Sequence, residues 1–276
     1  MKKIIFKLIN IDILIKVLYG KIILILIIIY KILPKQFQFC NTGVKNLEDL
    51  KKYSRNNLYK LLNNFFYFDL DLDLFLHRNF FQKEKFSSFG DNNFHSMWYL
   101  IFKNFKPVNC LEIGVYKGQV ITLFSLLMKK FKYNGKVFAL SPFSDVGDST
   151  SDYKKTNYLK ITREAYNTLK LPRPIYCISL SHLKKGKMFI SKNKFDLIYI
   201  DGNHDYKIVM SDYLHCLKSL NTKGVLVLDD SSLYTNFNLS FKGHPGPSKV
   251  FKTALNNRKL KFLFGLGHQN VFQKTI

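Results

Sequence analysis

From residue 108 onward, short apolar runs of strand length alternate with longer segments of helical apolar spacing. The runs predict strands over Val108–Ile113, Lys136–Leu140, Ile175–Ser179, Phe195–Ile200 and Gly224–Leu228. The intervening segments predict helices over Gly118–Phe131, Asp152–Leu169 and Tyr206–Leu220. This alternation is typical of a doubly wound, mostly parallel α/β sheet. Leu260–Gly265 and Asn270–Lys274 instead flank a turn, so they predict a hairpin that adds an antiparallel edge strand.

The first 90 residues lack this alternation and divide into two parts. Residues 1–35 are rich in Ile and Leu, with lysines at both ends, whereas residues 36–90 are mixed and are expected to form a linker or a helical cap. Within the second part, alternating Asp and Leu over Asp69–Leu74 predict a short half-exposed strand or a loop. A helical pattern resumes over Phe94–Phe105, and we expect residues 91–276 to form the main domain.

Two interpretations of the apolar segment 1–35 stay open. Leu8–Tyr30 holds sixteen Leu, Ile and Val residues, and their transfer into a bilayer contributes roughly −5 to −10 kcal/mol. Asp12, Lys16 and Lys21 offset this by roughly +8 to +10 kcal/mol. The segment therefore fits an interfacial or signal-anchor-like helix at a membrane surface, which the flanking lysines favour, or a helix packed on a partner subunit of a homo-oligomer. No small-residue cleavage site follows it, so we do not expect a secreted precursor.

The charge raises the question of a nucleic-acid partner. There are 43 Lys and Arg against 19 Asp and Glu, a formal net charge of +24, which suits nucleic acid or an anionic membrane surface. The basic residues are scattered, however, and accompany an excess of Ile, Asn, Phe and Tyr that is typical of an A/T-rich coding sequence. No nucleic-acid-binding motif accompanies them, so nucleic acid is not the partner that we expect.

The four cysteines point to a reducing compartment. Cys40, Cys110, Cys177 and Cys216 form no CxxC pair, so neither a zinc site nor a redox motif is indicated. We expect buried thiols in a cytoplasmic protein, associated with a membrane only through residues 1–35.

Three blocks of residues carry candidate chemistry at predicted strand ends. Glu112-Ile113-Gly114-Val115-Tyr116-Lys117-Gly118 follows the first strand, where glycines let a ligand approach the backbone and the helix start offers positive charge. Its spacing excludes the G-x-G-x-x-G dinucleotide fingerprint. Asp201-Gly202-Asn203-His204 follows the strand Phe195–Ile200, and Asp229-Asp230 follows Gly224–Leu228. In open α/β sheets, ligands bind at this carboxyl edge.

The acidic residues of the last two blocks predict a cation site. Adjacent parallel strands would bring Asp201, Asp229 and Asp230 to one edge, and three such carboxylates are unfavourable together without a cation. Carboxylate oxygens favour Mg²⁺, Ca²⁺ or Mn²⁺ over soft metals.

Together the three blocks resemble class I S-adenosylmethionine-dependent methyltransferases, in the form of the catechol O-methyltransferases and the macrocin O-methyltransferase type. The resemblance covers about residues 90–274. It implies a Rossmann-like domain that binds S-adenosylmethionine through Glu112, Gly114, Tyr116 and Gly118. It also implies that Asp201, Asp229 and Asp230 bind Mg²⁺. His204 would act as the general base, and Asp201 would also be a catalytic residue. The implied acceptor is a hydroxyl of a sugar, a glycan or a related small molecule, rather than a catechol.

The sequence departs from that family at the second and third strands. Relatives end the second strand in an acid that binds the ribose, whereas this chain has Ser141, with Asp145 or Asp148 as substitutes. Ser181 and His182 follow the third strand, where relatives place small polar residues beside the adenine. These departures keep two alternatives open, a non-catalytic member of the fold and a nucleic-acid methyltransferase or RNA-binding protein. Around His244, the run Gly243–Pro247 is expected to be a rigid loop rather than a substrate lid.

Overall fold

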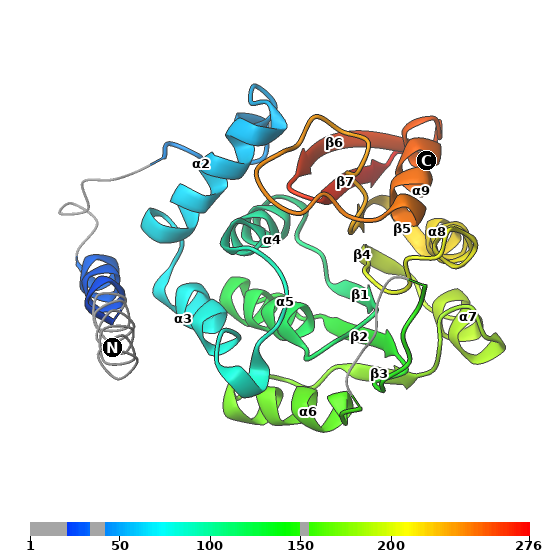
Figure 1. The fold of residues 1–276 in the computed structure, drawn as a ribbon, viewed down its shortest axis with the longest axis horizontal. Coiled ribbons are helices and arrows are strands. Elements are labelled where there is room, and N and C mark those ends of the chain that lie inside the picture. The colour runs from blue at the N-terminus through cyan, green and yellow to red at the C-terminus, as the bar shows by residue number, and fades with distance from the viewer. Residues whose placement is uncertain (1–20, 34–41, 150–154) are drawn as a thin grey trace, which may run out of the picture.

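The computed structural model describes residues 21–33, 42–149 and 155–276, and its centre is a seven-stranded sheet (Figure 1). The strand order is β3-β2-β1-β4-β5-β7-β6. β1 to β5 run parallel, whereas β7 is antiparallel to both β5 and β6. The predicted doubly wound sheet with an antiparallel edge is thus confirmed. The strands are β1 (Asn109–Ile113), β2 (Lys136–Ser141), β3 (Ile175–Ile178), β4 (Phe195–Ile200), β5 (Leu220–Leu228), β6 (Leu260–Leu266) and β7 (Gln269–Lys274).

Helices cover both faces of the sheet. One face packs against α4 (Asn92–Phe105), α5 (Gln119–Phe131) and α6 (Tyr158–Thr168), and the other against α7 (Lys184–Ser191), α8 (Tyr206–Ser219) and α9 (Pro245–Leu255) (Figure 1). The predicted helix start at Asp152 lies outside the described residues, and α6 begins at Tyr158. The prediction of a rigid loop over Gly243–Pro247 is wrong from Pro245 onward, because Pro245 begins α9. Proline suits the first turn of a helix, where no backbone N–H is needed.

Alternation along the strands divides the core into two layers. On β4, Leu197 and Tyr199 pack against the α4 and α5 side, while Ile198 and Ile200 pack against the α8 side. This two-sided burial explains the nearly continuous apolar run of the central strands. Cys110, Cys177 and Cys216 are buried free thiols, as predicted, whereas Cys40 lies outside the described residues.

Residues 42–90 form a helical cap that shares its core with the sheet. It contains the 3₁₀ turns Glu48–Leu50 and Glu84–Phe86 and the helices α2 (Arg55–Phe68) and α3 (Leu72–Phe80). The strand or loop predicted for Asp69–Leu74 is wrong in its second half, because Leu72 begins α3 and Leu74 is buried in the core. The half-buried Arg55 donates to the carbonyls of Gly267 and Gln269, at 3.0 and 3.1 Å. The cap is therefore fixed to the turn between β6 and β7.

Residues 21–32 form a helix that packs one face on the cap. Leu24, Ile27 and Ile28 contact the core, and Lys31 Nζ donates to the carbonyl of Phe66 at 3.1 Å and to that of Leu70. Within the described residues, no helix has both the length and the apolar character needed to cross a membrane. Residues 1–20 and 34–35 of the predicted segment lie outside the described part of the chain. The membrane-surface and partner-subunit interpretations stay predictions. The outward face exposes Ile22, Ile23, Ile25, Leu26, Ile29, Ile32 and Leu33.

Candidate active site

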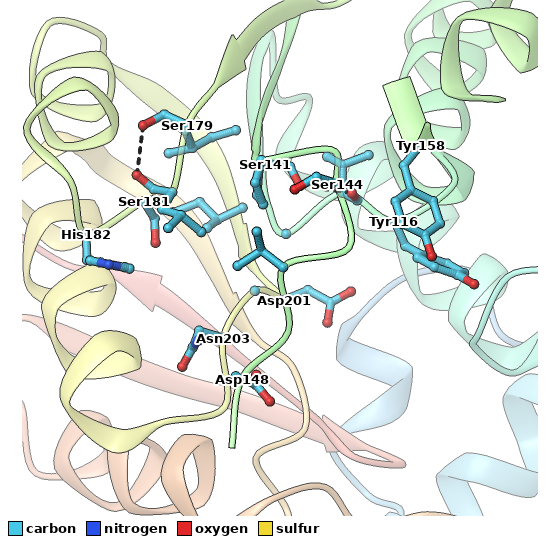
Figure 2. Close-up of a pocket in the computed structure, with 18 of the residues that line it drawn as sticks. Tyr116, Ser141, Ser144, Asp148, Tyr158, Ser179, Ser181, His182, Asp201 and Asn203 are labelled. Atoms are coloured by element: carbon cyan, nitrogen blue, oxygen red, sulfur yellow. Dashed lines mark hydrogen bonds between the residues drawn. The ribbon is translucent and has the colours of Figure 1, made fainter. Parts of the chain in front are cut away.

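A pocket of about 660 Å³ lies at the carboxyl ends of β1 to β4. The rings of Tyr116 and Tyr158 lie at one end of it, and Ser181 and His182 lie at the other, with Asp201 between them (Figure 2). Of the predicted cofactor residues, the pocket is lined by Gly114, Tyr116, Ser141, Ser181 and His182.

The backbone at Gly114 explains why glycine stands in the first strand-to-helix turn. Gly114 has a φ of +97°, and a Cβ atom there would overlap the carbonyl oxygen of Asp201. The ends of β1 and β4 can approach so closely only because this side chain is absent. The turn therefore places Asp201 against the pocket.

Two other predicted cofactor residues do not line this pocket. Glu112 is buried beneath α5, where desolvation raises the pKa of its carboxyl well above the ordinary value, although the amide of Ile121 offsets part of that effect. Gly118, with a φ of +89°, caps the N-terminus of α5 and packs against Thr162.

The hydroxyl groups near the second and third strands are already engaged. Ser141 Oγ donates to the carbonyl of Val115 at 3.0 Å, and Ser181 Oγ donates to Asp212 Oδ2 at 2.8 Å. Burial raises the pKa of Asp212 to about 7, while Ser181 and the charge of Lys187 lower it less. Ser141 and Ser181 can still accept hydrogen bonds from a ligand.

A second, larger cleft of about 1,920 Å³ adjoins the first pocket. The two share Gly114, Tyr116 and Asp201 in their linings. Aromatic rings and titratable groups line the cleft, so it combines apolar faces with hydrogen-bonding groups. Its lining includes Phe89, Phe94, Trp98, Tyr199, Asp201, His204, Asp229, Asp230, Phe241, His244 and His268.

The three predicted carboxylates meet in this cleft. The amide of Asp201 donates to Ile113 O at 2.9 Å and that of Asp229 donates to Ile200 O at 3.0 Å, so the ladder of parallel strands holds both residues. Burial, followed by the charges of Asp229 and Asp230, raises the pKa of Asp201 well above the ordinary value. Burial and the charge of Asp230 also raise the pKa of Asp229. Carboxylates with raised pKa values at one strand edge make this cleft a candidate functional site.

Asp230 differs because histidines surround it. Its burial alone would raise its pKa, but the hydrogen bond from His204 and the charges of His268, His204 and His244 outweigh burial and lower it. Asp230 also has a left-handed φ of +48°. This uncommon backbone conformation follows the end of β5 and begins the loop that leads to His244, whose amide donates to Asp230 O.

His204 lies between two carboxylates. Its Nε2 is 3.0 Å from Asp230 Oδ2 and its Nδ1 is 2.9 Å from Asp148 Oδ2, while its backbone N–H donates to Asp148 at 2.7 Å. Burial alone would lower the pKa of His204, but the hydrogen bond and charge of Asp230, with the charge of Asp148, raise it. Asp148, proposed from the sequence only as a ribose substitute, thus fixes the orientation of the predicted base.

Two further histidines complete the cluster, and neither was predicted as a site residue. The amide of His244 donates to Asp230 O at 2.8 Å, and its ring lies tilted against that of His204, with ring centroids 4.2 Å apart. His268 lies in the turn between β6 and β7, with Nε2 3.5 Å from Asp229 Oδ1. The predicted hairpin could have indicated His268, because the turn that precedes a strand antiparallel to β5 lies at the carboxyl end of β5.

A family of methyltransferase domains matches residues 111–231, which include the turn after β1, Asp201, His204 and both residues Asp229 and Asp230. This stretch of the chain is therefore similar to a methyltransferase domain. Among curated proteins, none matches the sequence. The match covers β2 to β5 and most of β1, whereas β6 and β7, with His268 between them, lie beyond it.

Solved methyltransferase structures share the fold of this domain. A putative caffeoyl-CoA O-methyltransferase from Staphylococcus aureus is 12% identical, with a TM-score of 0.56, over 80% of this chain and 99% of that one. An SAH-bound methyltransferase from Podospora anserina is 14% identical, with a TM-score of 0.53, over 75% and 89%. The O-methyltransferase TomG from Streptomyces achromogenes, in complex with SAM, is 10% identical, with a TM-score of 0.51, over 75% and 91%. At these identities, the likeness concerns the fold.

Proposed function

We propose that this protein is an S-adenosylmethionine-dependent O-methyltransferase whose acceptor hydroxyl binds in the larger cleft. One observation carries the proposal: Gly114, Tyr116 and Asp201 line both the 660 Å³ pocket and the cleft that holds the carboxylates and histidines. A cofactor in the first pocket and an acceptor in the second would therefore meet at these three residues. Methyl transfer needs this contact, because the reaction is a direct displacement between two bound molecules.

The residues that line the pocket suit the chemistry of the cofactor. The aromatic rings of Tyr116 and Tyr158 offer apolar and electron-rich faces to a sulfonium cation or an adenine. Ser181 and His182 offer polar atoms at the opposite end (Figure 2). The neighbouring folds solved with SAH and SAM support this choice of cofactor.

His204 is the residue that we propose takes the acceptor proton. The acceptor oxygen would form a bond to the methyl carbon as the carbon–sulfur bond breaks, and the bonding pair would stay on sulfur. The hydroxyl proton would pass to Nε2 of His204, in the place that Asp230 Oδ2 holds in the metal-free protein, while Asp148 keeps Nδ1 in position. Asp201, at the contact between the two pockets, would help to position the acceptor.

A divalent cation at the carboxylates fits the cluster. Asp201 and Asp229 have pKa values raised by burial and by neighbouring negative charge, and a bound cation would relieve both. When bound, it would lower the pKa of an acceptor hydroxyl. Asp201, Asp229 and Asp230 are the oxygen ligands predicted from the sequence.

For the acceptor, we propose a hydroxyl of a sugar, a glycan or a related small molecule. Phe94, Trp98 and Phe241 give the cleft flat apolar surfaces, while the neighbouring acids and histidines can accept or donate hydrogen bonds. A sugar ring presents both kinds of surface, with C–H groups on its faces and hydroxyls at its edge.

The test is methyl transfer from labelled S-adenosylmethionine to a panel of sugars, catechols and RNA, with and without divalent cations. We expect label on a hydroxyl oxygen of a small molecule. His204→Ala should bind the cofactor normally in calorimetry but turn over about 10²–10⁴-fold more slowly. Label on RNA, or full activity in both His204→Ala and Asp201→Asn, would contradict the proposal.

A further inference from the structure

The turn between β6 and β7 brings an imidazole to the carboxylates at the end of β5. His268 Nε2 lies 3.5 Å from Asp229 Oδ1 and 3.8 Å from Asp230 Oδ1. The ring is held edge-on against Phe94, with ring centroids 4.8 Å apart. Its own carbonyl accepts the Ser231 amide at 2.8 Å, directly after the acidic pair. His268 is therefore fixed by packing and by backbone bonding, and its nitrogen faces two carboxylate oxygens.

One of these carboxylate oxygens is buried and accepts no hydrogen bond from the described residues. Asp229 is only 8% exposed, and its Oδ1 has no hydrogen-bond partner within the described part of the chain. A buried carboxylate oxygen without a partner is costly unless a proton or a cation compensates it. One ligand atom from each of Asp229, Asp230 and His268 lies within 4.8 Å of the other two, so one ion can contact all three residues.

The spacing agrees with ligation of one ion. Ligand atoms that each lie about 2.0–2.2 Å from a cation are themselves roughly 3–4 Å apart. The separations of 3.5 and 3.8 Å from His268 Nε2 fall in this range. A second three-residue group, formed by His204, Asp230 and His244, is less suited because both ring nitrogens of His204 already face carboxylates, at 2.9 and 3.0 Å.

We infer that Asp229, Asp230 and His268 form a three-ligand site for a first-row divalent cation such as Mn²⁺, Fe²⁺, Co²⁺ or Zn²⁺, rather than for Mg²⁺. Imidazole nitrogen suits first-row transition ions, whereas Mg²⁺ takes oxygen ligands almost entirely. The inference concerns the same site as the proposed methyl transfer and rests on it for its biological role. The assay for the ligand set needs no turnover.

The experiment measures metal binding to the metal-free protein. Co²⁺ is titrated by its visible absorption, and Mg²⁺ by calorimetry, on wild type and on His268→Ala. We expect His268→Ala to weaken Co²⁺ binding by at least about 10- to 100-fold, because it removes a ligand, and to leave Mg²⁺ binding nearly unchanged. His268→Asp should restore an oxygen ligand and shift the preference toward Mg²⁺. His215→Ala, at a half-buried histidine of α8 that lines neither pocket, is the matched control.

A wild-type measurement keeps the test independent of folding in the variants. Bound Mn²⁺ should show electron spin-echo modulation from a coordinated imidazole nitrogen. Equal Co²⁺ affinity in wild type and His268→Ala, or absence of that modulation, would overturn the inference. A loss on His244→Ala instead of His268→Ala would also overturn it, by assigning the ion to the other group. Methyl transfer can succeed or fail in either case, so the two proposals fail separately.

Discussion

His204 Nε2 lies 3.0 Å from Asp230 Oδ2, which joins the loop after β4 to the loop after β5 at the centre of the site. This contact couples the charges of the two loops. It also has an electrostatic consequence, because a negative partner stabilises the protonated imidazole. Together with Asp148, it raises the pKa of His204 despite burial. In the metal-free protein, His204 therefore holds its proton to a higher pH than an ordinary histidine.

The first prediction removes the other carboxylate of this arrangement. Asp148→Asn keeps the shape of the side chain but loses its charge, so the pKa of His204 should fall relative to wild type. Because a base must be deprotonated to act, the acidic limb of the rate profile should move to lower pH. The measurement is a proton NMR titration of the His204 ring in metal-free protein, assigned with His204→Gln. An unchanged midpoint would show that Asp148 does not act on His204.

The second prediction concerns the close approach of β1 and β4. Gly114→Ala would push a methyl group into the Asp201 carbonyl, so we expect loss of cofactor binding in calorimetry and a clearly lower melting temperature. Gly43→Ala is a matched control, because Gly43 also has a positive φ, +73°, but a Cβ there meets nothing within 4 Å. Both variants carry backbone strain of about 1 kcal/mol or more. If Gly43→Ala lost as much binding, strain alone would explain the effect.

How far the site could be predicted depends on how each residue reaches it. Asp201, Asp229 and Asp230 follow apolar runs, and the register of parallel strands then places them together, so local patterning was enough. His268 depends on a long-range pairing, that of β7 with β5. Asp148 lies in a loop without periodicity, and only the folded chain shows that it contacts His204. The fold was predictable from periodicity, whereas residues brought by loops and chain reversals were not.

A third prediction tests the buried acid behind Ser181. The pKa of Asp212 rises from 3.8 to about 7 on folding, mainly through burial, so the folded state binds this proton more tightly than the unfolded state. The contribution of Asp212 to the free energy of unfolding is therefore fully present below pH 3.8. It is lost as the pH rises toward about 7, and the loss is at most about 4 kcal/mol. Asp212→Asn should remove this loss while keeping an acceptor for Ser181.

Urea unfolding at pH 5 and pH 8 measures this difference. The stability of Asp212→Asn relative to wild type should be greater at pH 8 than at pH 5. Glu84→Gln, at an exposed acid, is the control and should show a gap that does not widen with pH. A pH-independent gap for Asp212→Asn would mean that Asp212 titrates normally in the folded protein.

The last prediction concerns the helix at residues 21–32. Its only charged residue after Lys21 is Lys31, and that ammonium turns inward to the carbonyls of Phe66 and Leu70, so the outward face is wholly apolar. Residues 1–35 hold seven lysines and one aspartate, a net charge of +6. Two copies would repel each other through this charge, whereas an anionic lipid surface would attract it by about 1 kcal/mol for each nearby lysine. We therefore propose that this face binds an anionic membrane surface.

Co-sedimentation with vesicles that contain phosphatidylserine tests this. The double variant Ile25→Ser, Ile29→Ser should partition roughly 100-fold more weakly, because two half-exposed apolar side chains together contribute about 3 kcal/mol when lipid buries them. Leu214→Ser with Leu255→Ser removes similarly exposed leucines from α8 and α9 and should leave partitioning unchanged. Binding should also weaken with salt and in vesicles of phosphatidylcholine alone. If the first variant instead abolished a concentration-dependent dimer and vesicles were never bound, the face would be a contact between subunits.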